Sequence, residues 1–197
     1  MNWRTYIEYL FKKGDYSTVI SELKKNITTN NEPFVSFIDL LYTYFYIIQY
    51  EHDPPYDDYF KWTEKLRNVY EEFSQRWINR PDFLFFIAYM AEAFAEFYIG
   101  LEEKDTTEMY KKAHELNPNN LLYQWGVYNS RLHSNEIDRV QLCKQQSLKL
   151  LKDDECVNQI MRFPLLGKDL LNYIKTFIKV NSTESVITTI SANPEKW

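Results

Sequence analysis

The chain has 197 residues, and it is poor in glycine, cysteine and histidine. Four glycines, scattered along it, form no phosphate-binding loop and supply few turns for a many-stranded sheet. Two cysteines, Cys143 and Cys156, are too few for a disulfide scaffold or a cysteine-type zinc site. We expect both thiols to pack as small apolar side chains in a protein of a reducing compartment. The three histidines lie far apart and show no metal-binding spacing. The sequence therefore predicts neither a cofactor nor a metal.

Positive charge is also in short supply. A net charge of −5 and a pI near 5.3 argue against nucleic-acid binding, which needs a cationic surface. The start of the chain carries charges where a signal peptide needs an apolar region. Of two long apolar runs, Phe34–Tyr50 is short for a membrane span and contains Asp39, whereas Phe83–Leu101 contains Glu92 and Glu96. We expect a cytoplasmic protein in which both runs are buried helices.

Catalytic motifs are missing as well. The sequence has no Gly-x-Ser-x-Gly elbow and no cysteine with a convincing histidine partner, so we predict no enzyme. The alternative of an uncommon helical active site stays open. Residues 52–58 combine one histidine with three carboxylates, which favours a solvated acidic loop over a metal site because the ligand spacing is wrong. Within it, Asp57 and Asp58 are candidate contacts for a basic partner.

Aromatic residues are abundant, with 16 Tyr, 13 Phe and 5 Trp. Each buried ring removes about 150–250 Å² from water, which predicts an aromatic core. Apolar residues recur at helical spacing, which predicts an all-α fold in a single domain over residues 1–180, and a tail at 181–197 with at most one weak helix. The predicted helices cover 2–13, 16–27, 34–50, 56–79, 83–99, 105–116, 121–133, 136–151, 153–163 and 166–180.

The stretch from Asp82 to Asn120 has the pattern of one helical hairpin. A buried helix is followed by a turn at residues 100–104, and Asp105 with Glu108 has the spacing of a capping box at the start of the second helix. That helix ends before Pro118, which has no amide to donate.

Its second helix and closing turn resemble a tetratricopeptide repeat. Tyr110 matches the aromatic position of that motif, Ala113 the small packing position and Pro118 the closing proline. The resemblance implies a curved stack of antiparallel helix pairs whose first helices line a concave, protein-binding groove. Residues 34–80 do not follow the repeat and interrupt the stack. Weaker copies of the motif involve Trp3, Leu10, Gly14 and Leu23 near the N-terminus, and Trp125 and Gly126 in residues 121–152.

Polar residues on the apolar helices are the candidate contacts with a partner. Glu92 and Glu96 lie one turn apart, and Glu103 extends their line. Buried carboxylates need partners, so either a neighbouring helix supplies Arg or Lys, or the pair lines an open groove and receives a cation from another protein. The same two interpretations, internal hydrogen bonding or partner contact, apply to a stripe along one face of the helix at 34–50. This stripe consists of Ser36, Asp39, Thr43, Tyr46 and Tyr50.

In size, acidity and lack of a catalytic motif, the chain is also similar to immunity proteins of bacterial toxin systems. That resemblance implies a protein, monomeric when free, that blocks a cognate, often basic, nuclease toxin sterically and electrostatically. The alternative is a tetratricopeptide-like scaffold or co-chaperone that binds an extended peptide in its groove. We predict contacts with another protein, and with neither nucleic acid nor membrane.

Overall fold

The computed structural model describes residues 2–50, 56–94, 99–130 and 136–179. Within these ranges the chain forms helices and no strand, which confirms the all-α prediction. The predicted tail at 181–197 lies outside the described residues. The helices are α1 (Trp3–Lys12), α2 (Tyr16–Thr28), α3 (Pro33–Tyr50), α4 (Tyr56–Ser74), α5 (Pro81–Phe94), α6 (Glu103–Leu116), α7 (Leu121–Asn129), α8 (Glu136–Leu150), α9 (Asp154–Met161) and α10 (Leu166–Lys179).

Short polar side chains begin several helices. The Asn2 side chain accepts a hydrogen bond from the amide of Arg4 at 3.0 Å before α1. Asp153 does the same for Cys156 at 3.0 Å before α9. Asn120 accepts from two amides before α7, at 2.9 and 3.2 Å. These side chains satisfy amides that have no partner within the first turn, which is why the helices start where they do.

Several predicted helix ends were wrong. Helix α7, for example, ends at Asn129, four residues before the predicted end. Helix α6 begins at Glu103, because the Asp105 carboxylate accepts the Glu102 amide at 2.8 Å; Asp105 is therefore the third helical residue and not the cap. Helix α4 ends at Ser74, five residues before the predicted end. Tight turns follow it, such as the bond from the Trp77 amide to the Ser74 carbonyl at 2.9 Å.

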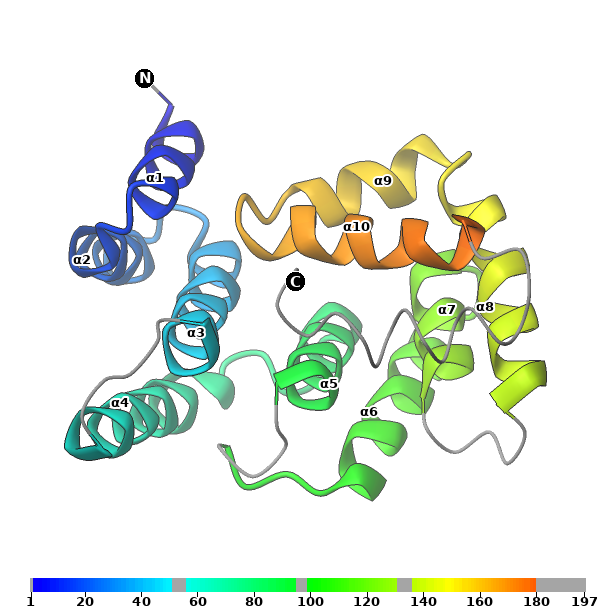
Figure 1. Ribbon diagram of the computed structural model, residues 1–197, viewed down its shortest axis with the longest axis horizontal. Coiled ribbons are helices and arrows are strands. Elements are labelled where there is room, and N and C mark those ends of the chain that lie inside the picture. Colours follow the sequence, from blue (N-terminus) through cyan, green and yellow to red (C-terminus); the bar gives the residue numbers. More distant parts are fainter. Residues whose placement is uncertain (1, 51–55, 95–98, 131–135, 180–197) are drawn as a thin grey trace.

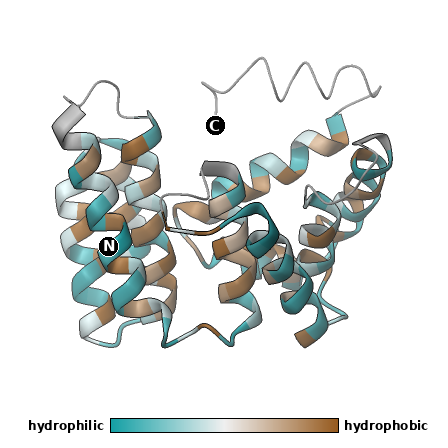
Figure 2. Ribbon diagram, turned by 90° about the horizontal axis from the view of Figure 1, so that it is seen from below, coloured by the Kyte–Doolittle hydropathy of each residue, from teal (hydrophilic) through white to brown (hydrophobic). Residues whose placement is uncertain are grey.

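Successive helices pack on one another, and α10 closes the structure. Contacts run from α1 to α4 in order, and again from α5 to α8. Helix α10 contacts α8 and α9 but also α3, and in Figure 1 it runs horizontally below α9, from beside α3 towards α8. Turned by 90°, the first helices stand side by side at one end of the molecule (Figure 2). Helix α10 thus joins elements that are far apart in the sequence.

The two long apolar runs form the central helices. Helix α3 contacts α2, α4, α5 and α10, and nearly every side chain along it is buried. Helix α5 contacts α3, α6 and α7, and its residues from Phe83 to Ala91 are all buried. This confirms burial in protein for the run at 34–50 and for residues 83–91 of the second run. Over the described ranges, no helix is both long enough and apolar enough to cross a bilayer.

Two glycines allow helices to approach closely. A Cβ on Gly126 of α7 would lie 2.5 Å from a ring carbon of Tyr110, and 2.8 Å from one of Phe85. A Cβ on Gly167 of α10 would lie 2.2 Å from the carbonyl oxygen of Ile160 in α9. Both distances are below any normal van der Waals contact, so only glycine fits.

Candidate partner-binding site

The first polar contact between α3 and α10 is made by Asp39. Its side chain is fully buried, and its Oδ1 accepts the amides of Leu165 and Leu166, at 3.3 and 3.1 Å, where α10 begins. Among the described residues, Oδ2 and the buried Oγ of Ser36 find no hydrogen-bond partner. Burial raises the pKa of Asp39 to about 8, although the two amides act in the opposite direction. Asp39 is thus an interior cap for α10.

One turn further along α3, Tyr42 donates a hydrogen bond to Asp169 in the first turn of α10. Tyr42 begins a row of rings on α3. Its centroid lies 6.2 Å from that of Tyr46, which lies 5.1 Å from that of Tyr50. Tyr46 also packs against Phe11 of α1 at 4.8 Å. Tyr46 and Tyr50 remain half-buried, so this row reaches the surface beside α10.

Tyr89 of α5 continues the row towards the second group of helices. Its pKa lies well above the ordinary value, first because the ring is buried and then because Tyr173, Asp169, Tyr50 and Glu92 are close. These four residues come from three helices, which shows that the side chains of α3, α5 and α10 converge around Tyr89.

Glu92, one turn after Tyr89, is held by hydrogen-bond donors of α6 and α7. Its Oε2 accepts the Tyr110 hydroxyl at 3.2 Å and the Asn129 amide at 3.3 Å. Asn129 in turn accepts the hydroxyl of Tyr173 at 3.3 Å, and its carbonyl accepts Arg139 at 3.2 Å. This polar network joins α5, α6, α7, α8 and α10 around a half-buried carboxylate.

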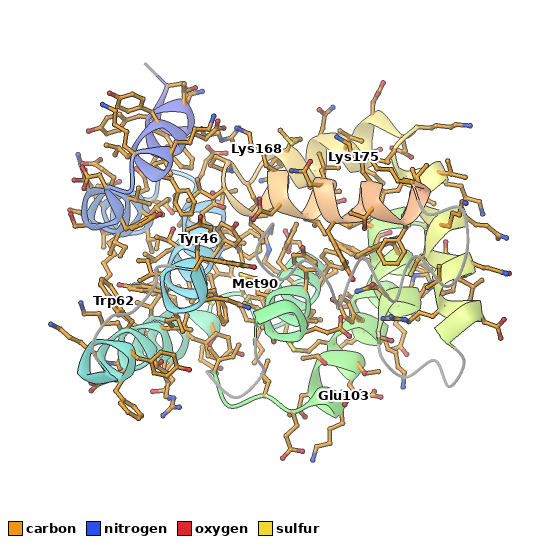
Figure 3. The ribbon with its side chains drawn as sticks, in the orientation of Figure 1. Tyr46, Trp62, Met90, Glu103, Lys168 and Lys175 are labelled. Carbon is orange, nitrogen blue, oxygen red and sulfur yellow. The ribbon has the colours of Figure 1, made fainter. Side chains whose placement is uncertain are left out.

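We call this set of side chains the tyrosine–carboxylate seam. It consists of Tyr42, Tyr46, Tyr50, Tyr89, Glu92, Asp169 and Tyr173. Figure 3 shows Tyr46 on α3 below Lys168 at the start of α10, and Met90 on the central helix α5. The seam thus follows the junction between the two groups of helices.

The seam offers hydrogen-bond donors and negative charge, and no nucleophile. Burial raises the pKa of Tyr42, Tyr50 and Tyr173, so the phenols stay protonated at neutral pH. Burial also raises the pKa of the nearby thiol Cys143 to about 12, which keeps it unreactive. No three His, Cys, Asp or Glu side chains in the described part of the chain are placed to share a metal ion. The chemistry available is recognition of a cation or a hydrogen-bond acceptor.

The structure does not bring all predicted site residues together. Tyr46, Tyr50 and Glu92 lie in the seam, whereas Glu103 is exposed at the start of α6, at the opposite side of the molecule in Figure 3. Asp39 lies inside, so the prediction that it faces a partner is wrong. Its carboxyl is needed by the amides before α10, which settles that residue in favour of internal hydrogen bonding.

Three predicted residues have no described side chain. Glu96 lies outside the described residues, and so does the loop at 51–55 with its histidine. Asp57 and Asp58 belong to the first turn of α4, but their side chains are not among those described. Their predicted contacts with a partner stay predictions.

Sequence reasoning missed Asp169, Tyr89 and Tyr173. Asp169 looks like an ordinary acid in a first helical turn, where its negative charge interacts favourably with the helix dipole. Tyr89 looks like one more apolar residue of a buried run. One signal was available: Asp169 and Tyr173 are four residues apart on α10, so they lie on one face of it.

Comparison of the chain with protein-family models, with curated proteins and with solved structures finds no match. What the site does must therefore be inferred from its geometry.

Proposed function

We propose that this chain is a cytoplasmic protein-binding module that takes up a cationic part of another protein at the tyrosine–carboxylate seam. The most specific form of the proposal is an immunity protein that neutralises a cognate basic toxin. The observation that carries it is the convergence of buried and half-buried tyrosines with Glu92 and Asp169 at the junction of α3, α5 and α10. Tyrosines supply contact area at little entropic cost, and carboxylates steer a basic partner.

The net charge of −5 supports this assignment, because it accelerates encounter with a positively charged protein. A bound toxin would be blocked sterically, and the carboxylates would occupy positions that its anionic substrate needs.

We also propose that α5–α8 form two consecutive tetratricopeptide-like hairpins. Tyr110 and Ala113, which match that motif, are fully buried, and Gly126 of the next hairpin touches the ring of Tyr110. Small residues that let neighbouring helices approach closely are typical of such stacks. This arrangement would position Glu92, on the first helix of its hairpin, towards a groove.

The experiment starts from affinity capture of the full chain in its native cell, followed by mass spectrometry, with the product of the neighbouring reading frame as the first candidate. Association of the purified partner is then measured at low and high salt. We expect Glu92→Gln combined with Glu96→Gln to slow association about tenfold and to weaken its salt dependence, since steering depends on charge.

The matched control is Asp154→Asn with Glu155→Gln, which removes two charges from the exposed surface of α9. Equal effects of the two double variants would show that net charge alone matters and would contradict the proposed site. Failure of any protein to bind the chain would contradict the function itself.

A further inference from the structure

Asp169 differs in its partners from Glu8 and Glu32, the two half-exposed carboxylates that pair with cations beside α1. Glu8 forms an ion pair with Lys168, and Glu32 forms one with Arg4. Asp169 accepts one hydrogen bond, from the neutral hydroxyl of Tyr42, and within the described residues no Lys or Arg lies at ion-pair distance from it. Lys168 is its sequence neighbour but is directed to Glu8. Over the described part of the chain, the negative charge of Asp169 therefore has no cation paired with it.

Burial adds to this imbalance. Asp169 is half-buried, and burial raises the pKa of its carboxyl, whereas the bond from Tyr42 lowers it. A partly desolvated carboxylate gains more from a cation than one in water does, because the surrounding dielectric is lower. The site is thus better prepared for a positive group than the exposed acids elsewhere on the chain.

Aromatic rings lie near the same carboxylate. The ring of Tyr42, which donates to Asp169, lies 6.2 Å from that of Tyr46. The ring of Tyr89 lies 6.1 Å from that of Tyr173, one turn after Asp169 on α10, and the charge of Asp169 contributes to the raised pKa of Tyr50 and Tyr89. Tyr46 adjoins Tyr50 with a centroid distance of 5.1 Å. Tyr89 is almost fully buried, whereas Tyr46 and Tyr50 are partly exposed. A cation is attracted both by the charge of the carboxylate and by the faces of the neighbouring aromatic rings.

We propose that Asp169, together with Tyr50 and Tyr89, receives the guanidinium of an arginine from the partner protein. This inference rests on the proposed function and names the chemistry of its main contact. Arginine fits better than lysine, since its guanidinium is planar, weakly hydrated, stacks on aromatic rings and bonds a carboxylate with two donors. The protein would thus select partners that present an exposed arginine.

The test uses the full chain and two capped peptides, tetra-arginine and tetra-lysine, with binding followed by amide chemical shifts of residues 166–173. Asp169→Asn removes the charge but keeps an oxygen for Tyr42. Glu155→Gln, on the exposed surface of α9, is the matched control. We expect tetra-arginine to bind several-fold tighter than tetra-lysine, and Asp169→Asn to weaken tetra-arginine about tenfold, with little change in the control.

Tyr50→Leu gives a second readout. It leaves the carboxylate in place and should reduce the preference for arginine over lysine, since the stacking surface is lost. Circular dichroism checks that each variant folds. The inference is overturned if both peptides bind equally to the wild type, or if Asp169→Asn and Glu155→Gln have the same effect.

These outcomes separate the arginine site from the proposed function. Suppose that Glu92→Gln with Glu96→Gln slows association of a captured partner, while Asp169→Asn does not change the affinity for tetra-arginine. The proposed function then stands, and the arginine site is contradicted. The opposite result is also informative. If tetra-arginine binds in a way that depends on Asp169 but no protein partner binds the chain, the cation site stands and the proposed function does not.

Discussion

The two ends of α10 are attached to the rest of the protein by different means. At its beginning, Asp39 accepts two backbone amides, and Asp169 accepts the hydroxyl of Tyr42. Near its end, the rings of Tyr173 and Phe177 each lie 5.9 Å from the ring of Trp125, in edge-to-face contact. Polar contacts depend on protonation and on exact partners, whereas ring contacts depend on shape and area. The first end should therefore respond to pH and the second should not.

The largest effect is expected at the aromatic end. Trp125 is fully buried, and its indole donates to the Oγ of Ser147 at 3.1 Å. Trp125→Ala would leave a large cavity beneath α10 and an unpaired hydroxyl, so we expect a loss of about 3–5 kcal/mol in the free energy of unfolding. Urea denaturation at pH 6 and pH 8 measures it, and the loss should be the same at both.

Leu148→Ala serves as the comparison, because this side chain of α8 is 41% exposed. It should change the free energy of unfolding by no more than about 0.5 kcal/mol. A similar loss for the two variants would mean that Trp125 is not the anchor of this end.

The polar end should show its contribution as a dependence on pH. Folding raises the pKa of Asp39 from 3.8 to about 8, so the folded state keeps a proton that the unfolded state releases. The stability linked to this proton is fully present below pH 3.8 and is lost as the pH rises through about 8. Between these two pH values, the free energy of unfolding falls by about 1.4 kcal/mol per pH unit.

Asp39→Asn isolates this effect. The amide keeps an oxygen for Leu165 and Leu166 and cannot ionise, and its NH₂ group lies one turn from the unpartnered Oγ of Ser36. We expect the variant to gain stability relative to the wild type as the pH rises from 5 to 9, by at least about 2 kcal/mol in total. Urea denaturation of both proteins across this range measures the difference. A constant difference would show that Asp39 ionises normally in the folded state.

The same contrast marks what the sequence could predict. Helices α3 and α5 followed from their apolar runs, because helical periodicity is a local property. The element that covers Asp39 was not predictable, since α10 begins 127 residues later, at Leu166. Periodicity shows that a face is buried and does not show against what.

The candidate site was predictable only in the part that breaks a pattern. Glu92 stood out as a charge in an apolar run, and it lies in the seam. Asp169 breaks no pattern, because an acid in the first turn of an amphipathic helix is ordinary. Its importance arises when Tyr42, from a distant helix, supplies its hydrogen bond in place of a cation. The predicted start of α6 was wrong for a related reason. Two overlapping acidic pairs fit the capping-box pattern, and only the backbone conformation distinguishes them.

The smallest effect is expected for the exposed ion pair beside Asp39. Glu8 and Lys168 join α1 to the start of α10, with side chains 27% and 40% exposed. Solvent screens such a pair, so Glu8→Gln should cost about 0.2–1 kcal/mol, and the cost should shrink at 1 M NaCl, where the Debye length falls to about 3 Å. Glu8 also contributes to raising the pKa of Asp39. Glu8→Gln should therefore move the pH-dependent loss of stability to lower pH, and Lys168→Met, which leaves the charge of Glu8 unpaired, should move it to higher pH. Shifts in the same direction for both variants would show that the ion pair acts on the docking of α10 and not on the proton of Asp39.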